Sequence, residues 1–407
     1  MSNLQSLIYK LHMLAGALDV SVGDMSYTHD DHNFQTMPNE DTPEVAVARH
    51  NAVLELKSVL LHLCKHCPNI QREPANALCR FLFSSKLPNV QSITVSNDPL
   101  LPSIVSYDKS ICKELRKVGY SETDVKSVCE NMYNISREAV KRLKAIPSVQ
   151  YLPPNNQNQV LVTRHDTDKW KLIWADHGTC ISDMHLKQLQ DLYRKHSGDI
   201  QGKHFNRRLY CLLIRYETLN APMYQCSCTK KTFDVMSQQF AVTKECFASP
   251  FNKNAEIYWS AFPDTDSFFG SQGDFFTDVR SLQQQGGSFY ANPPFVEEVI
   301  HVLRKRIEEM LTFDSPVSFI VVLPSWTDDE SHAWMVNNCI RYTTLQPNAH
   351  TYIEGNQQVN TKKAKIRHVA KFKSSVFILQ NKTGQQKWQV TDTNFDQLCD
   401  SWKSFNS

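Results

Sequence analysis

Glycine is scarce in this chain, with 12 residues among 407. This scarcity excludes a fold that depends on glycine-rich turns, and because no GxGxxG motif is present, a dinucleotide phosphate cradle is not expected. A GxSxG motif is also missing, so neither a Ser/His/Asp nor a Cys/His triad has support. The 15 histidines include no HxxxH or HxH pair with an acidic partner, and we therefore expect no metal site.

An excess of charge of one sign is absent too. The chain has 44 Lys and Arg residues against 42 Asp and Glu residues, a formal net charge of +2, which excludes a polycationic nucleic-acid coat and an acidic tail protein. No stretch approaches the roughly 18 continuous apolar residues of a membrane-spanning helix, and the amino terminus lacks the pattern of a signal peptide. We therefore expect a soluble, intracellular protein with no membrane partner.

The 12 cysteines, without a signal peptide, are interpreted mainly as reduced thiols packed as small apolar groups. Cys64 and Cys67 form a CxxC that Cys79 follows, and this spacing leaves a zinc site as the alternative. The helical interpretation is favoured, because residues 60–67 have helical apolar spacing and no second CxxC follows.

The first part of the chain has the apolar spacing of helices. Apolar residues recur at every third and fourth position over 45–63 and again over 121–143, where Ser121 begins an acidic variant of a helix-start box. Turn-forming residues over 151–158 indicate a connector. We therefore predict two domains, a helical domain over 1–150 and a second domain over 151–407.

Strands and helices alternate in the second part. The predicted elements are paired short strands over 160–173, helices over 185–195, 205–218, 231–240 and 295–311, and strands over 241–247, 288–291, 317–323 and 374–379. This alternation predicts an α/β fold with a mostly parallel, doubly wound sheet. The helices over 185–195 and 205–218 are expected to cover one face of that sheet.

The tetrapeptide Asn292-Pro293-Pro294-Phe295 lies where a predicted strand ends and a helix begins, at the edge where open α/β sheets bind ligands. Such a loop is suited to methylation of an adenine amine. This amine is a poor nucleophile, and an enzyme that accepts hydrogen bonds from both of its hydrogens favours the more tetrahedral nitrogen that attacks a methyl sulfonium. Asn292 offers a side-chain oxygen and Pro293 a main-chain carbonyl. The two prolines stiffen the loop, and Phe295 is predicted to stack on the base.

A candidate cofactor site precedes the tetrapeptide. A predicted strand runs through Glu245 and Phe247 into a turn of small residues, Ala248-Ser249-Pro250, which would lie under a methionine moiety. Asp264 and Asp266 follow the next short strand, and either bind the ribose or amino group of the cofactor or form a solvated acidic turn.

Four segments in order resemble one family. They are Glu245 to Pro250, Ala261 to Asp266, Asn292 to Glu298 and Val376 to Asn381, within a match over roughly 205–390. Together they resemble the phosphorylated-CTD-interacting factor family, the cap-specific adenosine N6-methyltransferases. The resemblance implies a helical domain packed on a Rossmann-like domain that uses S-adenosyl-L-methionine, with Asn292 to Phe295 as the catalytic and cofactor-contacting tetrapeptide.

The same resemblance implies a nuclear enzyme, with the cytoplasm as the alternative location, that N6-methylates the 2′-O-methyladenosine beside the 7-methylguanosine cap of mRNA. The expected substrate contacts are Glu297 and the stretch Trp326-Thr327-Asp328-Asp329-Glu330, since a methylated guanine favours an aromatic face and a carboxylate. The helical domain of the family supplies arginines, for which Arg137, Arg142 and Arg164 are the candidates here. We expect a monomer that binds capped mRNA.

Two features depart from the family pattern. No WW-like segment with two tryptophans and a Tyr-Tyr pair is found, since Trp170 is the first tryptophan, so we expect the chain to lack the WW domain. Binding to the C-terminal tail of RNA polymerase II through such a domain is then not expected. In addition, Pro324-Ser325-Trp326-Thr327 stands where Pro-Glu-Trp-Arg is expected, which removes an arginine contact.

Six basic residues and no acidic one lie between Lys362 and Lys373, and such a cluster either follows RNA phosphates or forms a solvated loop. Two other functions stay open. One is adenine N6-methylation of uncapped RNA or DNA, because the tetrapeptide alone does not distinguish substrates. The other is a catalytically silent module that binds RNA or the polymerase.

Overall fold

The structure is a computed structural model of the chain. It divides into two compact units, residues 1–37 and 38–407, and the first lies outside the part that is described. The described residues are 41–65, 75–83, 98–102, 109–117, 119–146, 159–219, 225–277, 279–355 and 367–403. The predicted domain boundary near residue 150 and the Cys64-Cys67 pair fall on or beside the gaps, so both stay predictions.

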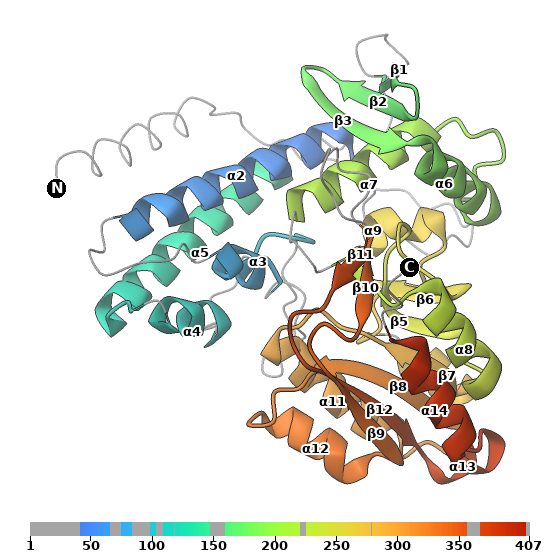
Figure 1. Ribbon diagram of the computed structural model, residues 1–407. Coiled ribbons are helices and arrows are strands. Elements are labelled where there is room, and N and C mark those ends of the chain that lie inside the picture. Colours follow the sequence, from blue (N-terminus) through green and yellow to red (C-terminus); the bar gives the residue numbers. More distant parts are fainter. Residues whose placement is uncertain are drawn as a thin grey trace, which may run out of the picture. The chain divides into compact units, whose positions relative to one another are not determined.

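The described residues of the first part of the second unit form the helices α2 (Pro43–Lys65), α3 (Ala75–Phe83), α4 (Lys109–Lys117) and α5 (Glu122–Ala145) (Figure 1). The predicted start of α5 is confirmed, because Ser121 is its N-cap and its Oγ accepts a hydrogen bond from the amide of Asp124 at 3.2 Å. The buried side chains of α5, from Val125 to Leu143, recur with the helical period and pack against α2 and α4.

A small antiparallel sheet comes next, with the order β1 (Leu161–Asp166), β2 (Lys169–Trp174), β3 (His177–Ser182). The paired strands were predicted, whereas the third was not. It is followed by α6 (Asp183–His196) and α7 (Phe205–Leu219), close to their predicted bounds. These helices pack on β3 and on each other. Helix α6 also packs on η3 (Ser267–Phe269), and α7 packs on α9 (Pro263–Asp266) and on α2.

The main sheet has six strands in the order β6 (Ile257–Ser260), β5 (Lys244–Ala248), β7 (Gly287–Ala291), β8 (Val317–Pro324), β12 (Ser374–Gln380), β9 (Arg341–Leu345). Strands β5 to β8 pair in parallel, while β12 is antiparallel to both of its neighbours. The α/β class is therefore confirmed, with a mixed sheet in place of a mostly parallel one.

Both faces of this sheet are buried, as β8 illustrates. Val317, Phe319 and Val321 belong to one apolar core, while Ile320 and Val322 belong to the opposite one. The first core includes residues of α10 (Val279–Gln285), α11 (Glu297–Met310) and α12 (Glu330–Asn338), and the second includes residues of α8 (Lys230–Phe240) and α14 (Asp392–Ser401). Helices thus lie on both faces, as expected where a continuous apolar run forms a central strand.

The remaining elements connect these layers: β4 (Cys226–Ser227), α9 (Pro263–Asp266), η3 (Ser267–Phe269), β10 (Thr351–Glu354), β11 (Arg367–Val369) and α13 (Lys382–Lys387). Strands β11, β10 and β4 form a second small sheet. Within the described ranges, no helix is both long enough and apolar enough to cross a membrane.

Candidate active site at the carboxyl ends of the parallel strands

A pocket lies where β5, β6 and β7 end. It encloses about 810 Å³ of empty space, including solvent at its mouth, which suits a small organic ligand. Its lining includes Ala248 at the end of β5, Ser260 at the end of β6 and Asn292 directly after β7. Since β6 and β7 lie on opposite sides of β5, the chain reverses direction across the sheet here, the position where open α/β sheets bind ligands.

The rest of the lining comes from helices α3, α7 and α11, from β4 and the residue before it, from β5, and from the loops that follow β5, β6 and β7. These residues are Phe83, Tyr216, Leu219, Gln225, Cys226, Cys246, Phe247, Asn252, Ala261, Asp274, Phe275, Phe276, Pro294 and Val299. The helical part of the chain therefore contributes to the pocket wall together with the sheet.

Asn292 has an orientation that the surrounding backbone sets. Its Nδ2 donates a hydrogen bond to the Cys226 carbonyl at 3.0 Å, so its Oδ1 points the other way. That Oδ1 is buried and has no hydrogen-bond partner among the described residues. A buried acceptor without a donor costs free energy, and a ligand that donates a hydrogen bond there removes the cost.

The rest of the tetrapeptide forms a tight connection to α11. Pro294 lines the pocket, and its carbonyl accepts a hydrogen bond from the amide of Val296 at 2.7 Å. Helix α11 begins at Glu297, two residues later than predicted. Phe295 is not among the pocket-lining residues, and its ring lies edge-on to that of Phe372 with the centroids 5.8 Å apart. Its predicted stacking on a base stays a prediction.

Part of the predicted cofactor segment lines the pocket, and the rest holds the neighbouring loop in place. Phe247 and Ala248 line the pocket. Glu245 is buried in β5, and its Oε2 accepts hydrogen bonds from the amides of Asn254 at 2.8 Å and Ala255 at 3.2 Å. Burial raises the pKa of Glu245 to about 7, although these two hydrogen bonds oppose the rise. Its visible role is to hold the loop between β5 and β6.

The turn after β5 is held by its own polar groups. The Ser249 amide and hydroxyl donate hydrogen bonds to Asn252 Oδ1 at 2.7 and 2.9 Å. The Pro250 carbonyl accepts a hydrogen bond from Gln188 Nε2 of α6 at 3.1 Å. Ser249 and Pro250 are absent from the pocket lining, and they fix the turn that brings Asn252 to it.

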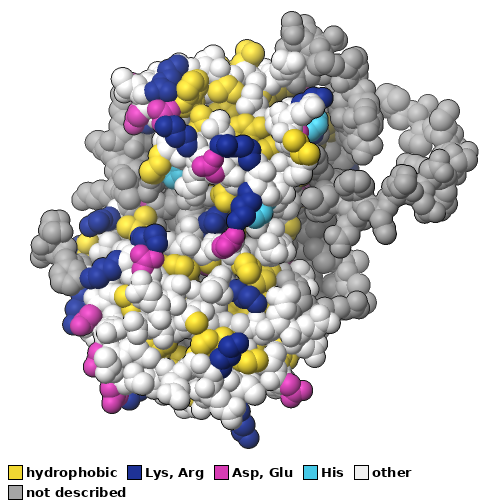
Figure 2. Space-filling model, turned by 90° about the vertical axis from the view of Figure 1, so that its right-hand side faces the viewer, with side chains coloured by type: hydrophobic (Ala, Val, Ile, Leu, Met, Phe, Trp, Pro, Cys, Tyr) yellow, Lys and Arg dark blue, Asp and Glu magenta, His cyan; other side chains and the backbone are white. Residues whose placement is uncertain are grey.

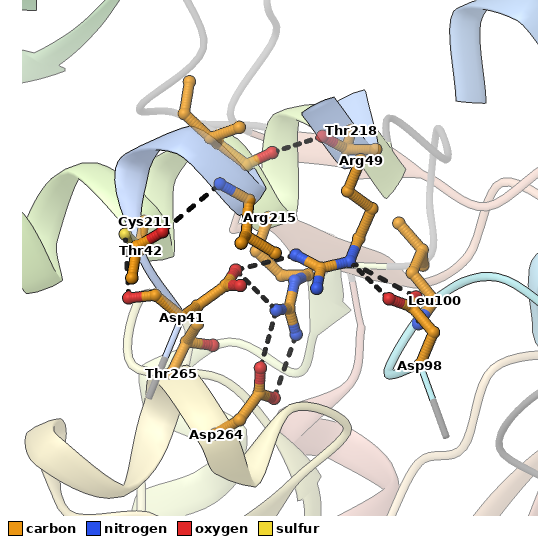
Figure 3. Close-up of polar contacts among 12 residues, drawn as sticks. Asp41, Thr42, Arg49, Asp98, Leu100, Cys211, Arg215, Thr218, Asp264 and Thr265 are labelled. Atoms are coloured by element: carbon orange, nitrogen blue, oxygen red, sulfur yellow. Dashed lines mark hydrogen bonds and ion pairs between the residues drawn. The ribbon is translucent and has the colours of Figure 1, made fainter. Parts of the chain in front are cut away.

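Asp264 belongs to a buried ion-pair network that Figure 3 shows. Arg215 of α7 donates to both Asp264 oxygens at 2.9 and 2.6 Å and to Asp41 at 2.8 Å. Asp41 also pairs with Arg49 of α2 at 2.7 Å, which in turn pairs with Asp98 at 3.0 Å. Burial alone would lower the pKa of Arg215, but Asp264 and Asp41 outweigh it and raise that pKa.

The network joins the helical part of the chain to the turn that contains Asp264. The carboxylate of Asp264 is therefore already paired with the buried guanidinium of Arg215. Asp266 is fully buried and accepts a hydrogen bond from Tyr216, a pocket-lining residue, at 2.6 Å. The solvated acidic turn that the sequence left as an alternative is therefore wrong for Asp266. The cofactor role predicted for Asp264 stays a prediction.

The chain is similar in sequence to a known family and to two named proteins. A family model described as "Phosphorylated CTD interacting factor 1 WW domain" matches residues 188–355, from α6 through β10. A Mus musculus protein named mRNA (2′-O-methyladenosine-N(6)-)-methyltransferase is 28% identical over 330 residues, which cover 70% of this chain and 45% of that protein. The Homo sapiens protein of the same name is 28% identical over 322 residues, with the same two coverages. The resemblance to the phosphorylated CTD interacting factor family is confirmed.

The chain spans about half the length of these curated relatives. The expected lack of a WW domain needs correction, because the matching family model has "WW domain" in its description. That expectation rested on the absence of a tryptophan pair. The residues that the family model matches instead include the ends of β5, β6 and β7 that line the pocket, together with the tetrapeptide.

The residues for which the family suggests substrate contacts lie at the start of α11 and between the end of β8 and the start of α12. Glu297 begins α11 and forms an ion pair with Lys113 of α4 at 2.5 Å. Trp326 is half-buried and packs against the apolar core on one face of the sheet. Asp329 is the N-cap of α12, Glu330 lies 3.4 Å from Arg304, and Thr327 and Asp328 are exposed. None of them lines the pocket, so their roles stay predictions.

The candidate arginines all have partners on the surface. Arg137 donates a hydrogen bond to Asn134 at 2.6 Å, and Arg142 pairs with Glu55 at 3.0 Å. Arg164 pairs with Asp183 at 3.0 Å and lies over the Trp170 ring at 4.9 Å. None lines the pocket, and their binding of substrate stays a prediction.

Several pocket residues lie outside the segments that the sequence singled out. Asp274 lies between η3 and α10, and Gln225, Phe83 and Leu219 come from segments far from the tetrapeptide, so no local pattern marked them. Asn252 lies two residues after the predicted Ala248-Ser249-Pro250 turn. In the described part of the chain, no group of three or more His, Cys, Asp or Glu side chains is placed to hold a metal ion.

RNA phosphates bind basic side chains, so the distribution of Lys and Arg on the surface bears on RNA binding. On the face in Figure 2, Lys and Arg side chains are scattered among hydrophobic ones and do not form one stripe. Of the predicted basic run, Arg367, Lys371 and Lys373 are described and exposed, while its other members lie outside the described residues. Its contact with RNA phosphates stays a prediction.

Proposed function

We propose that this chain transfers a methyl group from S-adenosyl-L-methionine to the N6 amine of the 2′-O-methyladenosine beside the mRNA cap. The observation that supports it most directly is the buried Asn292 Oδ1, an acceptor at a ligand pocket without a partner among the described residues. The names of the two relatives supply the substrate class.

Within the mixed α/β class, we propose the Rossmann-like arrangement of a methyltransferase. Strands β5 to β8 are parallel, β6 and β7 flank β5 on opposite sides, and helices cover both faces. The antiparallel β12 between β8 and β9 distinguishes this sheet from a fully parallel doubly wound one.

The residues present fit the proposed methyl donor. S-adenosylmethionine supplies an electrophilic methyl group on a sulfonium, together with an adenine ring and polar ribose and amino groups. Phe247, Phe275 and Phe276 provide aromatic surface for the ring, and Asp274 provides a polar group. The small side chains of Ala248 and Ser260 leave room at the ends of β5 and β6.

The catalytic role falls to groups that accept hydrogen bonds. Asn292 Oδ1 accepts one hydrogen of the target amine, and the main-chain carbonyl of Pro293 is assigned the second. These two bonds hold the amine in one orientation and favour the tetrahedral geometry in which its lone pair can attack. The proline nitrogens carry no hydrogen, so they do not compete as donors for the acceptors in this loop.

For the capped end of the substrate we propose the aromatic face of Trp326 and the carboxylates that follow it, because a methylated guanine is cationic. The first proposed cellular partner is capped mRNA. The second is the phosphorylated C-terminal tail of RNA polymerase II, which we propose to bind through residues 188–355, the region that matches the family model. We propose a nuclear location and a monomer.

The test is methyl transfer from labelled S-adenosylmethionine to matched short RNAs that begin with 2′-O-methyladenosine, with and without a cap, followed by nucleoside mass spectrometry. Label in N6,2′-O-dimethyladenosine of the capped RNA alone is the expected result. Equal label in both RNAs would overturn the cap assignment and leave an adenine-amine methyltransferase. Bound cofactor without transfer to either RNA, or to adenine in DNA, would indicate a catalytically silent binding module.

A further inference from the structure

The orientation of the Asn292 amide depends on one backbone group, the carbonyl of Cys226. An asparagine side chain presents its oxygen to a ligand only if its nitrogen has an acceptor on the other side. If the Cys226 carbonyl shifted, the amide would lose that acceptor and could turn its nitrogen toward the pocket. The segment that contains Cys226 therefore has to be held in place.

Strand β4 is weak support by itself. It has two residues, Cys226 and Ser227, and it lies at the edge of its sheet, paired with β10 alone. The residue before it, Gln225, is held more firmly, because its carbonyl accepts hydrogen bonds from Asn252 Nδ2 at 2.9 Å and from the amide of Gly355 at 3.0 Å. Both donors come from outside β4.

Asn252 is itself fixed at both ends of its side chain. Its Oδ1 accepts hydrogen bonds from the amide and hydroxyl of Ser249, while its Nδ2 donates to Gln225. A side chain held by hydrogen bonds at both its oxygen and its nitrogen is a stiff connector between the end of β5 and the start of β4. It also lines the same pocket as Asn292.

Gly355 closes this arrangement from the other side. A Cβ atom on Gly355 would lie 2.6 Å from Asn252 Cβ and 2.9 Å from the Gln225 carbonyl oxygen. Real Cβ contacts do not come so close to backbone, so the end of β10 approaches Asn252 and Gln225 only because residue 355 has no side chain.

We propose that Asn252 is a positioning residue for the reaction: by holding Gln225 it fixes the Cys226 carbonyl, which orients the Asn292 amide so that its oxygen faces the substrate amine. The inference rests on the proposed function, since the amine is the ligand that this oxygen would meet. Asn252 acts through the backbone of β4 and is not itself assigned a contact with the reacting atoms.

The experiment uses three variants of the full chain. Asn252→Asp keeps the acceptor for Ser249 but replaces the donor to Gln225 with an oxygen, and Asn252→Ala removes both without adding charge. Ser227→Ala is the matched control, because it removes a hydrogen bond of 2.9 Å from Asn254 to the same strand and leaves Gln225 untouched. Each variant is assayed for kcat and KM on capped RNA and for cofactor affinity by calorimetry.

We expect both Asn252 variants to lower kcat by roughly 10-fold or more while the KM for RNA and the cofactor Kd change by less than about threefold. Ser227→Ala should retain wild-type kcat. A loss in Asn252→Asp alone would assign the effect to the added charge and overturn the inference. An equal loss of kcat in Ser227→Ala would show that any weakening of β4 lowers kcat, and it would overturn a specific role for Asn252.

A spectroscopic measurement separates this inference from the proposed function. In protein labelled with 15N-asparagine, the side-chain signals of Asn292 are assigned by their loss in Asn292→Ala. We expect them to shift in Asn252→Ala and to stay in place in Ser227→Ala. Unshifted Asn292 signals in Asn252→Ala would overturn the positioning role, whereas a wild-type chain without methyl transfer would overturn the proposed function and leave this readout intact.

Discussion

Lys113 of α4 donates hydrogen bonds to both carboxylate oxygens of Glu297, at 2.7 and 2.5 Å. The pair connects the helical part of the chain to the first residue of α11, which directly follows the tetrapeptide Asn292 to Phe295 and Val296. The hydrogen bond that Lys113 donates to Glu297 raises the pKa of Lys113, although both side chains remain partly exposed, at 46% and 29%. The carboxylate predicted to meet substrate is thus already paired.

Replacing Lys113 with Ala is expected to lower the free energy of unfolding by no more than about 1 kcal/mol, because exposed ion pairs are screened by water. A double-mutant cycle with Glu297→Gln, measured by urea unfolding, should give a coupling energy that falls at high salt. A coupling well above that value, insensitive to salt, would contradict the expectation.

Asn292→Ala is expected to reduce methyl transfer by at least about 10²–10³-fold, the scale for removing one preorganised hydrogen-bonding group at a reacting centre. Stability should fall by no more than about 1–2 kcal/mol, because the variant loses the hydrogen bond from Asn292 Nδ2 to the Cys226 carbonyl, while Asn292 Oδ1 has no partner to lose among the described residues. Activity is measured on capped RNA, with thermal unfolding as the control for folding. Near-wild-type turnover would rule out the proposed role.

Asp264→Asn is expected to destabilise the protein by roughly 3–5 kcal/mol, since it leaves the fully buried Arg215 short of a charged partner. The exposed Asp328→Asn serves as a control with a change within about 0.5 kcal/mol. Chemical unfolding of both variants, together with cofactor titration, distinguishes two roles for Asp264. Unchanged stability with weakened cofactor affinity would restore the cofactor contact predicted from sequence.

Glu245 gives a pH dependence of stability. Burial raises its pKa from 4.5 to about 7, so between these values the folded chain binds more protons than the unfolded one. The stabilisation is complete below pH 4.5 and is lost as the pH rises through about 7, by roughly 1.4 kcal/mol per unit of pKa shift.

Glu245→Gln should therefore flatten the fall in unfolding free energy between about pH 5 and 7. It should not remove the fall entirely, because burial also raises the pKa of Asp266, to about 6. Urea unfolding of wild type and variant at several pH values checks this. Parallel curves for the two proteins would mean that Glu245 ionises normally in the folded state.

Local patterns in the sequence were sufficient for much of the fold. The helical period and the cap at Ser121 identified α5, and the strand predicted over 317–323 is β8, which the structure shows to be buried on both faces. The pattern did not reveal that β12 pairs antiparallel between β8 and β9, because strand order depends on contacts between distant segments. Short elements such as β4 and β10 lack enough residues to show a period.

The same limit applies to the site. The tetrapeptide could be placed after a strand because its signal is local. The pairing of Asp264 with Arg215, 49 residues earlier in the chain, could not be inferred, and neither could the contact of Asn252 with Gln225. Acidic residues after a strand look alike in sequence whether they meet a ligand or a buried arginine.

Gly355→Ala provides a final prediction that does not alter any pocket-lining side chain. Because the new Cβ would meet Asn252 Cβ at 2.6 Å and the Gln225 carbonyl at 2.9 Å, the end of β10 and the Gln225 segment must move apart. We expect kcat on capped RNA to fall while the fold is retained, as for the Asn252 variants. Gly384→Ala is the control for glycine replacement away from the pocket, since its Cβ would meet Val317 instead and should lower stability, not kcat of the folded fraction. Full kcat in Gly355→Ala would show that Cys226 tolerates displacement of its neighbours, and the orientation of Asn292 would then need another support.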